Sequence, residues 1–171
     1  MIEGGIGGSN TRTGLIFEGV VDLATFLSNQ QGYTINENKE VFYNNKFVGR
    51  IFKKYDLYRF LEQNNVNWRT IISKRLLPDD SIYVIVNNTF FIIECKFQKV
   101  AGSVDEKLQT CDFKKKQYTK LFSPLGINIE YCYYLSEWFK QDEYRDVKQY
   151  ILDVGCRYFF DEIPLDYLGL D

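Results

Sequence analysis

Histidine is absent from the 171 residues of this chain, and methionine, proline and cysteine are scarce. Without histidine, the chain cannot build a Ser-His-Asp or Cys-His catalytic site or a His-ligated zinc centre. Its four cysteines are scattered and form no Cys-x-x-Cys pair. We therefore expect no zinc site, and free thiols in a reduced, cytoplasmic protein. Any hydrolysis must use carboxylates, lysine and a hard metal ion such as magnesium.

Long apolar runs are also missing, since none approaches the ~20 residues that span a bilayer. Residues 1–5 lack a basic region followed by an apolar stretch, so we expect no secretory signal and no membrane association. Apolar residues make up 45% of the chain and aromatic residues 17%, which argues against disorder. The length predicts a single domain, residues 1–171, with the glycine-rich residues 1–12 as an arm.

The apolar residues recur with helical spacing in some segments and with strand spacing in others. We expect helices at 14–30, 55–63, 102–122 and 136–153, a turn or helix at 68–73, and strands at 40–51, 81–94, 127–135 and 157–160, of which 40–51 and 81–94 are hairpins. Ser103, with Glu106 three residues later, has the pattern of a capping box at the start of the third helix. The order of elements predicts an α/β fold.

The second hairpin ends in charged residues. Side chains alternate along a strand, so Glu94 and Lys96 share one face. If Asn87-Asn88 is a two-residue turn, Asp79 lies opposite Lys96 and on the same face as Glu94. A slip of one residue would place Asp80 there instead, so Asp79 is preferred and Asp80 stays an alternative.

Asp79, Glu94 and Lys96 supply the groups that metal-assisted phosphodiester hydrolysis needs. The two carboxylates can hold magnesium beside a phosphate, and a main-chain carbonyl such as that of Cys95 can add a ligand. The metal polarises the phosphoryl group and acidifies a bound water, while Lys96 orients that water or stabilises the developing charge. An ordinary salt bridge from Lys96 to either acid accounts for the same spacing and stays an alternative.

Pro78-Asp79 and Glu94-Cys95-Lys96 together resemble the signature of the PD-(D/E)XK nucleases. Gln98 extends it to the Glu-x-Lys-x-Gln form of some restriction endonucleases. Three further segments resemble type II restriction-endonuclease-like proteins, namely residues 97–110, residues 9–14 with Glu18, and residues 163–170.

This resemblance implies a restriction-endonuclease-like mixed β-sheet flanked by α-helices, dependence on Mg²⁺, and cleavage of double-stranded DNA. It also implies that Asp79 and Glu94 are metal ligands and that Lys96 is the catalytic lysine. Gln98 would support the water or the phosphate, and Glu18 would be an additional catalytic acid.

The charge of the chain is unevenly distributed. The net charge of −2 does not indicate a nucleic-acid binder, but residues 96–120 hold seven lysines and three acids. Such a run is either a solvated face or a positive surface beside the site. The candidates for DNA contacts are Asn10, Thr11, Arg12, Lys99, Lys107, Lys114, Lys115 and Lys116.

These observations favour a magnesium-dependent, site-specific deoxyribonuclease of the type II restriction class. We expect a homodimer, because cutting both strands of a duplex calls for two sites. A cognate DNA methyltransferase encoded nearby would be its partner. Two alternatives remain: a structure-specific repair or junction nuclease of the same fold, and a non-catalytic DNA-binding or assembly module.

Overall fold

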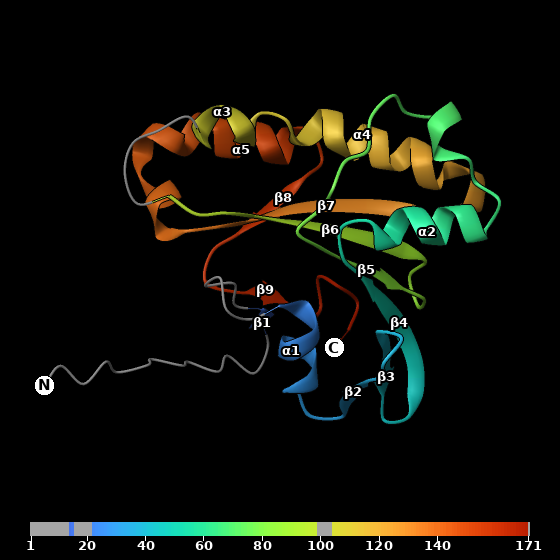
Figure 1. Cartoon of the computed structure of the whole chain (residues 1–171). Helices are drawn as coiled ribbons and strands as arrows, with labels where there is room; N and C mark the ends of the chain where they lie inside the picture. The colour runs from blue at the N-terminus through green and yellow to red at the C-terminus, as the bar shows by residue number, and fades with distance from the viewer. Residues whose placement is uncertain (1–13, 16–21, 99–103, 171) are drawn as a thin grey trace, which may run out of the picture.

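A seven-stranded sheet, in the order β2-β3-β4-β5-β6-β7-β8, forms the centre of the computed structural model, which describes residues 14–15, 22–98 and 104–170 (Figure 1). Neighbouring strands are antiparallel from β2 to β6 and parallel from β6 to β8. The strands are β2 (Tyr33–Ile35), β3 (Glu40–Tyr43), β4 (Lys46–Phe52), β5 (Asp80–Val84), β6 (Thr89–Lys96), β7 (Asn128–Leu135) and β8 (Arg157–Phe159). A separate pair joins β1 (Gly14–Leu15) to β9 (Ile163–Pro164).

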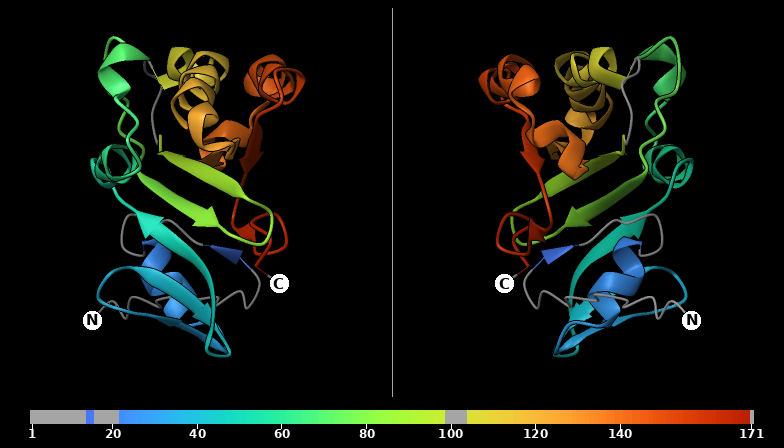
Figure 2. Two further views of the ribbon diagram at one scale, coloured as in Figure 1. Left: turned by 90° about the vertical axis from the view of Figure 1, so that its right-hand side faces the viewer. Right: turned by 90° about the vertical axis from the view of Figure 1, so that its left-hand side faces the viewer.

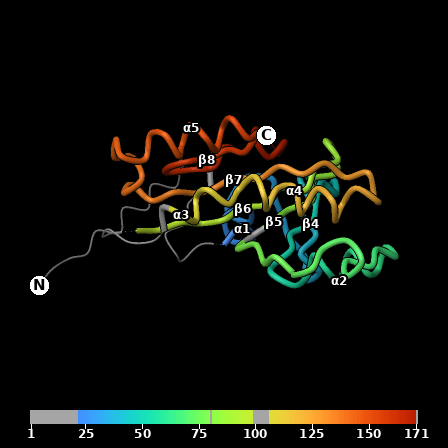
Figure 3. The backbone as a smooth tube through the Cα atoms, turned by 90° about the horizontal axis from the view of Figure 1, so that it is seen from above, coloured from blue at the N-terminus to red at the C-terminus, as the bar shows by residue number. Residues whose placement is uncertain are grey.

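Helices cover both faces of this sheet, so the predicted fold, a mixed sheet flanked by helices, is confirmed (Figures 1 and 2). One face carries α2 (Asp56–Gln63), α3 (Val104–Leu108), α4 (Cys111–Phe122) and α5 (Arg145–Asp153), and the other carries α1 (Leu23–Ser28). Seen from above, α4 runs along β6 and β7 (Figure 3). The 3₁₀ turns are η1 (Trp68–Thr70), η2 (Ser123–Leu125), η3 (Glu137–Lys140) and η4 (Asp142–Tyr144).

Strand β6 supplies side chains to both hydrophobic cores. Phe90 and Ile92 belong to the core beneath α2, α4 and α5, whereas Phe91 and Ile93 belong to the core beneath α1. Because side chains alternate along a strand, the residues that follow at even positions face α4. This alternation decides where the charged end of β6 points.

The β5–β6 hairpin has a different register from the one expected. Val84 pairs with Thr89, so the loop is Ile85–Asn88 and not Asn87-Asn88 alone. Asn88 adopts a positive φ of 49° and its amide donates to the carbonyl of Gly126 at 2.8 Å, a tertiary contact that fixes the longer loop. The expected pairing of Asp79 with Lys96 is therefore wrong. The shift is even, so no side chain changes face.

Two predicted helices also need correction. The helix expected at 14–30 begins only at Leu23, because the Asp22 carboxylate caps it by accepting from the Thr25 N–H at 2.8 Å. Residues 14–15 are instead strand β1, which pairs with the chain's C-terminal tail. The helical region expected from 136 starts with η3 and η4 and becomes α-helical only at Arg145.

The helix expected at 102–122 is interrupted between α3 and α4. The carbonyl of Lys107 accepts from the Tyr133 hydroxyl at 3.1 Å and from the Thr110 hydroxyl at 2.8 Å, and these bonds replace the regular helical one. The capping residue expected for α3, Ser103, lies outside the described residues. The expected hairpin at 40–51, the helix at 55–63 and the strand at 127–135 are confirmed to within a few residues.

None of the four cysteines, which all lie in the described ranges, forms a disulfide bond. None of the helices in the described ranges has the length and apolar character needed to cross a membrane.

Candidate active site

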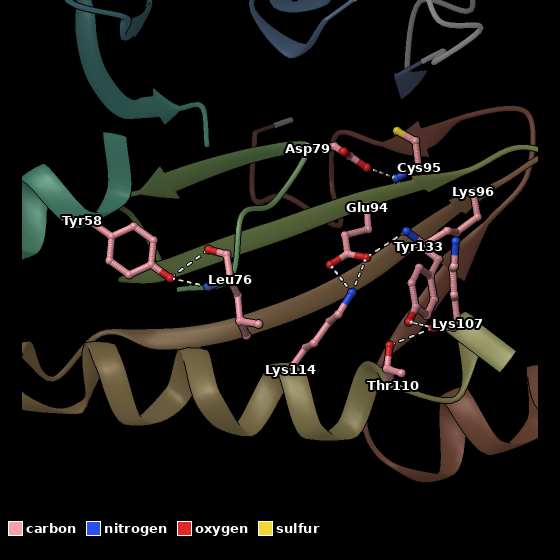
Figure 4. Close-up of polar contacts among 10 residues, drawn as sticks. All are labelled: Tyr58, Leu76, Asp79, Glu94, Cys95, Lys96, Lys107, Thr110, Lys114 and Tyr133. Atoms are coloured by element: carbon pink, nitrogen blue, oxygen red, sulfur yellow. Dashed lines mark hydrogen bonds and ion pairs between the residues drawn. The ribbon is translucent and has the colours of Figure 1, made fainter. Parts of the chain in front are cut away.

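Glu94 is a buried carboxylate near the carboxyl end of β6, where only 5% of the residue is exposed (Figure 4). The Nζ of Lys114, on α4, lies 2.9 Å from both carboxylate oxygens, and the Nζ of Lys96 lies 3.1 Å from Oε2. Burial alone would raise the pKa of Glu94, but Lys114 and Lys96 outweigh this effect and lower it. Glu94 is therefore an anion at neutral pH, and the prediction that it shares a face with Lys96 is confirmed.

Lys114 reaches Glu94 because of its place on α4. Cys111 and Tyr118 are buried against the sheet, and Lys114 lies between them at helical spacing, three residues after one and four before the other. A lysine within such a stripe must find an anion or solvent. The sequence identified Lys114 only as a candidate for DNA contact, although its position in the apolar stripe was a signal that it would point toward the sheet.

Asp79 lies just before β5 and reaches the same end of β6. Its Oδ2 accepts from the main-chain N–H of Cys95 at 2.8 Å, so it sits beside the residue that follows Glu94 (Figure 4). The ladder pairs Asp80 with Ile93, whose side chain enters the core beneath α1. Because the two strands are antiparallel, Asp79, which precedes Asp80, lies level with Glu94, which follows Ile93.

A tyrosine of α2 holds the segment that leads to Asp79. The Tyr58 hydroxyl accepts from the Leu76 N–H at 2.7 Å and donates to the Leu76 carbonyl at 2.8 Å (Figure 4). Burial raises the pKa of Tyr58 to about 12, so the hydroxyl keeps its proton and can make both bonds at neutral pH. The contact fixes the backbone three residues before Asp79.

Two further tyrosine hydroxyls are buried close to the carboxylates. That of Tyr118, on α4, makes no hydrogen bond to any described residue, whereas that of Tyr131, on β7, lies where it can interact with the Glu94 carboxylate. Burial raises the pKa of both tyrosines, and the negative charge of Glu94 raises it further, with Asp79 adding to the effect at Tyr118. Both hydroxyls therefore keep their protons and are neutral donors beside Glu94.

Gln98 follows β6 and is held by its main chain. Its N–H donates to the Ser136 hydroxyl at 3.1 Å, and that hydroxyl donates to the Gln98 carbonyl at 3.2 Å. Its side-chain amide is buried and makes no hydrogen bond within the described ranges. Both polar atoms of the Gln98 side chain therefore lack a protein partner among the described residues.

The other predicted site residues are dispersed. Lys107 is exposed and extends from α3 toward Lys96 (Figure 4). Lys115 donates to the Gly155 carbonyl at 2.6 Å, and Lys116 pairs with Asp112 at 2.8 Å on the exposed side of α4. The predicted residues that lie outside the described ranges are Asn10, Thr11, Arg12, Glu18 and Lys99.

The oxygen ligands of the site match the preference of a hard divalent cation. Magnesium needs only one or two protein carboxylates, since waters and phosphate oxygens complete its coordination shell. One oxygen of Asp79 accepts a hydrogen bond from the Cys95 N–H, and both oxygens of Glu94 accept hydrogen bonds from Lys114. Within the described ranges, no group of three or more His, Cys, Asp or Glu side chains is placed to hold a metal. Asp79 and Glu94 are the two carboxylates at this end of β6 that could hold such a cation.

Comparison with known families gives one match. Residues 27–119, more than half of the chain, match the model of a PD-(D/E)XK nuclease superfamily domain. No curated protein and no solved structure matches significantly. The matched region runs from α1 to α4 and contains Asp79, Glu94, Lys96 and Lys114. This match, together with the mixed sheet and the acid–lysine group at the end of β6, establishes that the chain belongs to the PD-(D/E)XK nuclease superfamily.

Proposed function

We propose that this protein is a magnesium-dependent endonuclease that hydrolyses the phosphodiester bonds of double-stranded DNA as a type II restriction enzyme. One observation carries the proposal. Strand β6 and the segment just before β5 bring Asp79, Glu94 and Lys96 to one end of the sheet. The chain that carries them belongs to a nuclease superfamily.

The proposed roles follow from the chemistry of each side chain. Asp79 and Glu94 hold the metal, which, when bound, polarises the phosphoryl group and lowers the pKa of a water. Lys96 is fixed by Glu94 and directs its ammonium toward the attacking water or the phosphate oxygens. Gln98 offers an uncommitted amide to the same water or phosphate. Glu18 is proposed as an additional acid.

The DNA would be held mainly through its phosphates. Lys107, which extends toward Lys96, and Lys116, on the exposed side of α4, are suited to such contacts. Residues 10–12 and Lys99 are proposed to contact the same duplex. We further propose a homodimer, with one site for each strand, that acts in the cytoplasm beside a cognate DNA methyltransferase.

Plasmid digestion tests the proposal. The wild-type protein should cut plasmid DNA in Mg²⁺ into discrete fragments and should be inactive in EDTA. Lys96→Ala and Asp79→Ala should each lower the rate by about a hundredfold or more, the scale of a lost acid–base or charge-stabilising group.

The control is Lys120→Ala, which removes an exposed lysine elsewhere on α4 and should leave the rate unchanged. If Lys96→Ala and Asp79→Ala cut as fast as the wild type, the site assignment is wrong. Preference for branched over linear DNA would favour a junction nuclease. DNA binding without cleavage would favour a non-catalytic module.

A further inference from the structure

More positive charge surrounds Glu94 than is needed to neutralise its carboxylate. One carboxylate faces two ammonium groups, although either lysine alone would neutralise it. Only 6% of the Glu94 side chain is exposed, so both ion pairs lie in a region that water screens weakly. The second ammonium group therefore needs an explanation beyond neutralising the carboxylate of Glu94.

The two lysines contact Glu94 differently. Lys96 comes from two residues along the same strand, and its ammonium lies 3.1 Å from Oε2. Lys114 comes from another element and lies 2.9 Å from both Oε1 and Oε2. A metal ion that takes either oxygen of Glu94 therefore meets the ammonium of Lys114.

We propose that Lys114 competes with the divalent cation for Glu94. Its ammonium bridges the carboxylate in the metal-free protein and leaves it when the cation binds. The inference rests on the proposed function, because it takes Glu94 as a metal ligand. The physical reason is that a divalent cation at bonding distance from Glu94 and an ammonium bridging the same two oxygens would repel each other strongly.

Lys114 then has two roles at one carboxylate. Before the cation binds, it holds the Glu94 carboxylate in place through both oxygens, and it offsets the cost of burying that charge. When the cation binds, the long side chain of Lys114 has only to rotate away, while Lys96 keeps its contact with Oε2. The cost of that displacement lowers the affinity of the site for metal.

Titration of the full chain with Mn²⁺ by calorimetry, without DNA, tests the competition. Lys114→Gln should lower the Kd for Mn²⁺ by at least about tenfold, because it removes a positive charge from the carboxylate. Lys114→Arg keeps that charge and should stay close to the wild type. Lys120→Gln is the matched control, since it removes an exposed charge from the same helix and should change the Kd by less than about twofold. Adding Glu94→Gln to Lys114→Gln should abolish the tight binding.

Lysine labelling of the wild-type protein is a second test that does not depend on how any variant folds. Mn²⁺ should increase the acetylation of Lys114 by an amine-reactive ester, measured by mass spectrometry, and should leave that of Lys120 unchanged. An unchanged or lower acetylation of Lys114 overturns the proposal, as does an unchanged or higher Kd for Lys114→Gln. If no variant binds Mn²⁺, the proposal also fails, and plasmid cleavage by the wild type in Mg²⁺ then shows whether the proposed function stands without it.

Discussion

Asp79 and Glu94 reach one end of the sheet in different ways, and the difference decides which neighbours matter. Glu94 belongs to β6, and the alternation of the strand sets its direction. Asp79 precedes β5, so its position depends on the Cys95 N–H and on the backbone before it, which Tyr58 holds at Leu76. At the residue scale, Tyr58 is therefore a positioning residue for Asp79.

Tyr58→Phe tests this role. The variant loses both hydrogen bonds to Leu76, so the free energy of unfolding should fall by about 1–2 kcal/mol, as measured by urea denaturation. Nuclease activity should fall as well, and the apparent affinity for Mg²⁺ should weaken, because Asp79 is held less firmly. Tyr55→Phe is the control, since Tyr55 is half-exposed at the start of the same helix and the change should have little effect. If the two variants have the same stability, activity and affinity for Mg²⁺, Tyr58 does not position Asp79.

At the scale of elements, the start of α1 depends on one carboxylate. Asp22 caps the helix and also pairs with Lys53 at 2.5 Å. The bond to Lys53 is the main reason that the pKa of Asp22 falls from 3.8 to about 2. A lowered pKa means that Asp22 stabilises the fold above pH 3.8 and that this contribution is lost as the pH falls toward 2.

Asp22→Ala should lower the free energy of unfolding at pH 6 by about 1 kcal/mol, the usual cost of a lost cap. Asp22→Asn keeps a capping oxygen and should lose only the ion pair, which is worth less than about 1 kcal/mol because both partners are partly exposed. Urea unfolding at pH 6 and at pH 2.5 shows how the stabilisation by the Asp22 carboxylate changes with pH. The difference between the wild type and Asp22→Asn should shrink at the lower pH, and a difference that grew would contradict the assignment.

The same scale shows what the sequence could predict. Helix α2, the β3–β4 hairpin and strand β7 follow from local patterns, because each has a regular apolar period or clear turn residues. The register of β5 and β6 does not, since Asn88 is fixed by Gly126, which is distant in the chain. The break before α4 also depends on a distant residue, Tyr133 of β7.

At the scale of the whole molecule, the site depends on contacts between distant parts of the chain. The sequence predicted that Glu94 and Lys96 share a face, because that follows from the two-residue period of a strand. It did not predict the contact of Lys114 with Glu94, which requires α4 to lie along β6 and β7 (Figure 3). The pairing of β1 with β9 likewise joins the two ends of the chain, and strands this short leave no periodic signal.

Cleavage of supercoiled plasmid in Mg²⁺ by the wild type, Asp79→Asn and Asp80→Asn tests whether Asp79 is the acid that serves the nuclease site. These variants change adjacent carboxylates, of which only Asp79 is proposed to belong to the site. The wild type should convert plasmid to linear DNA, Asp79→Asn should be slower by about a hundredfold or more, and Asp80→Asn should retain cleavage. A wild-type protein that leaves the plasmid intact, or loss of cleavage in Asp80→Asn while Asp79→Asn cuts normally, would contradict the account.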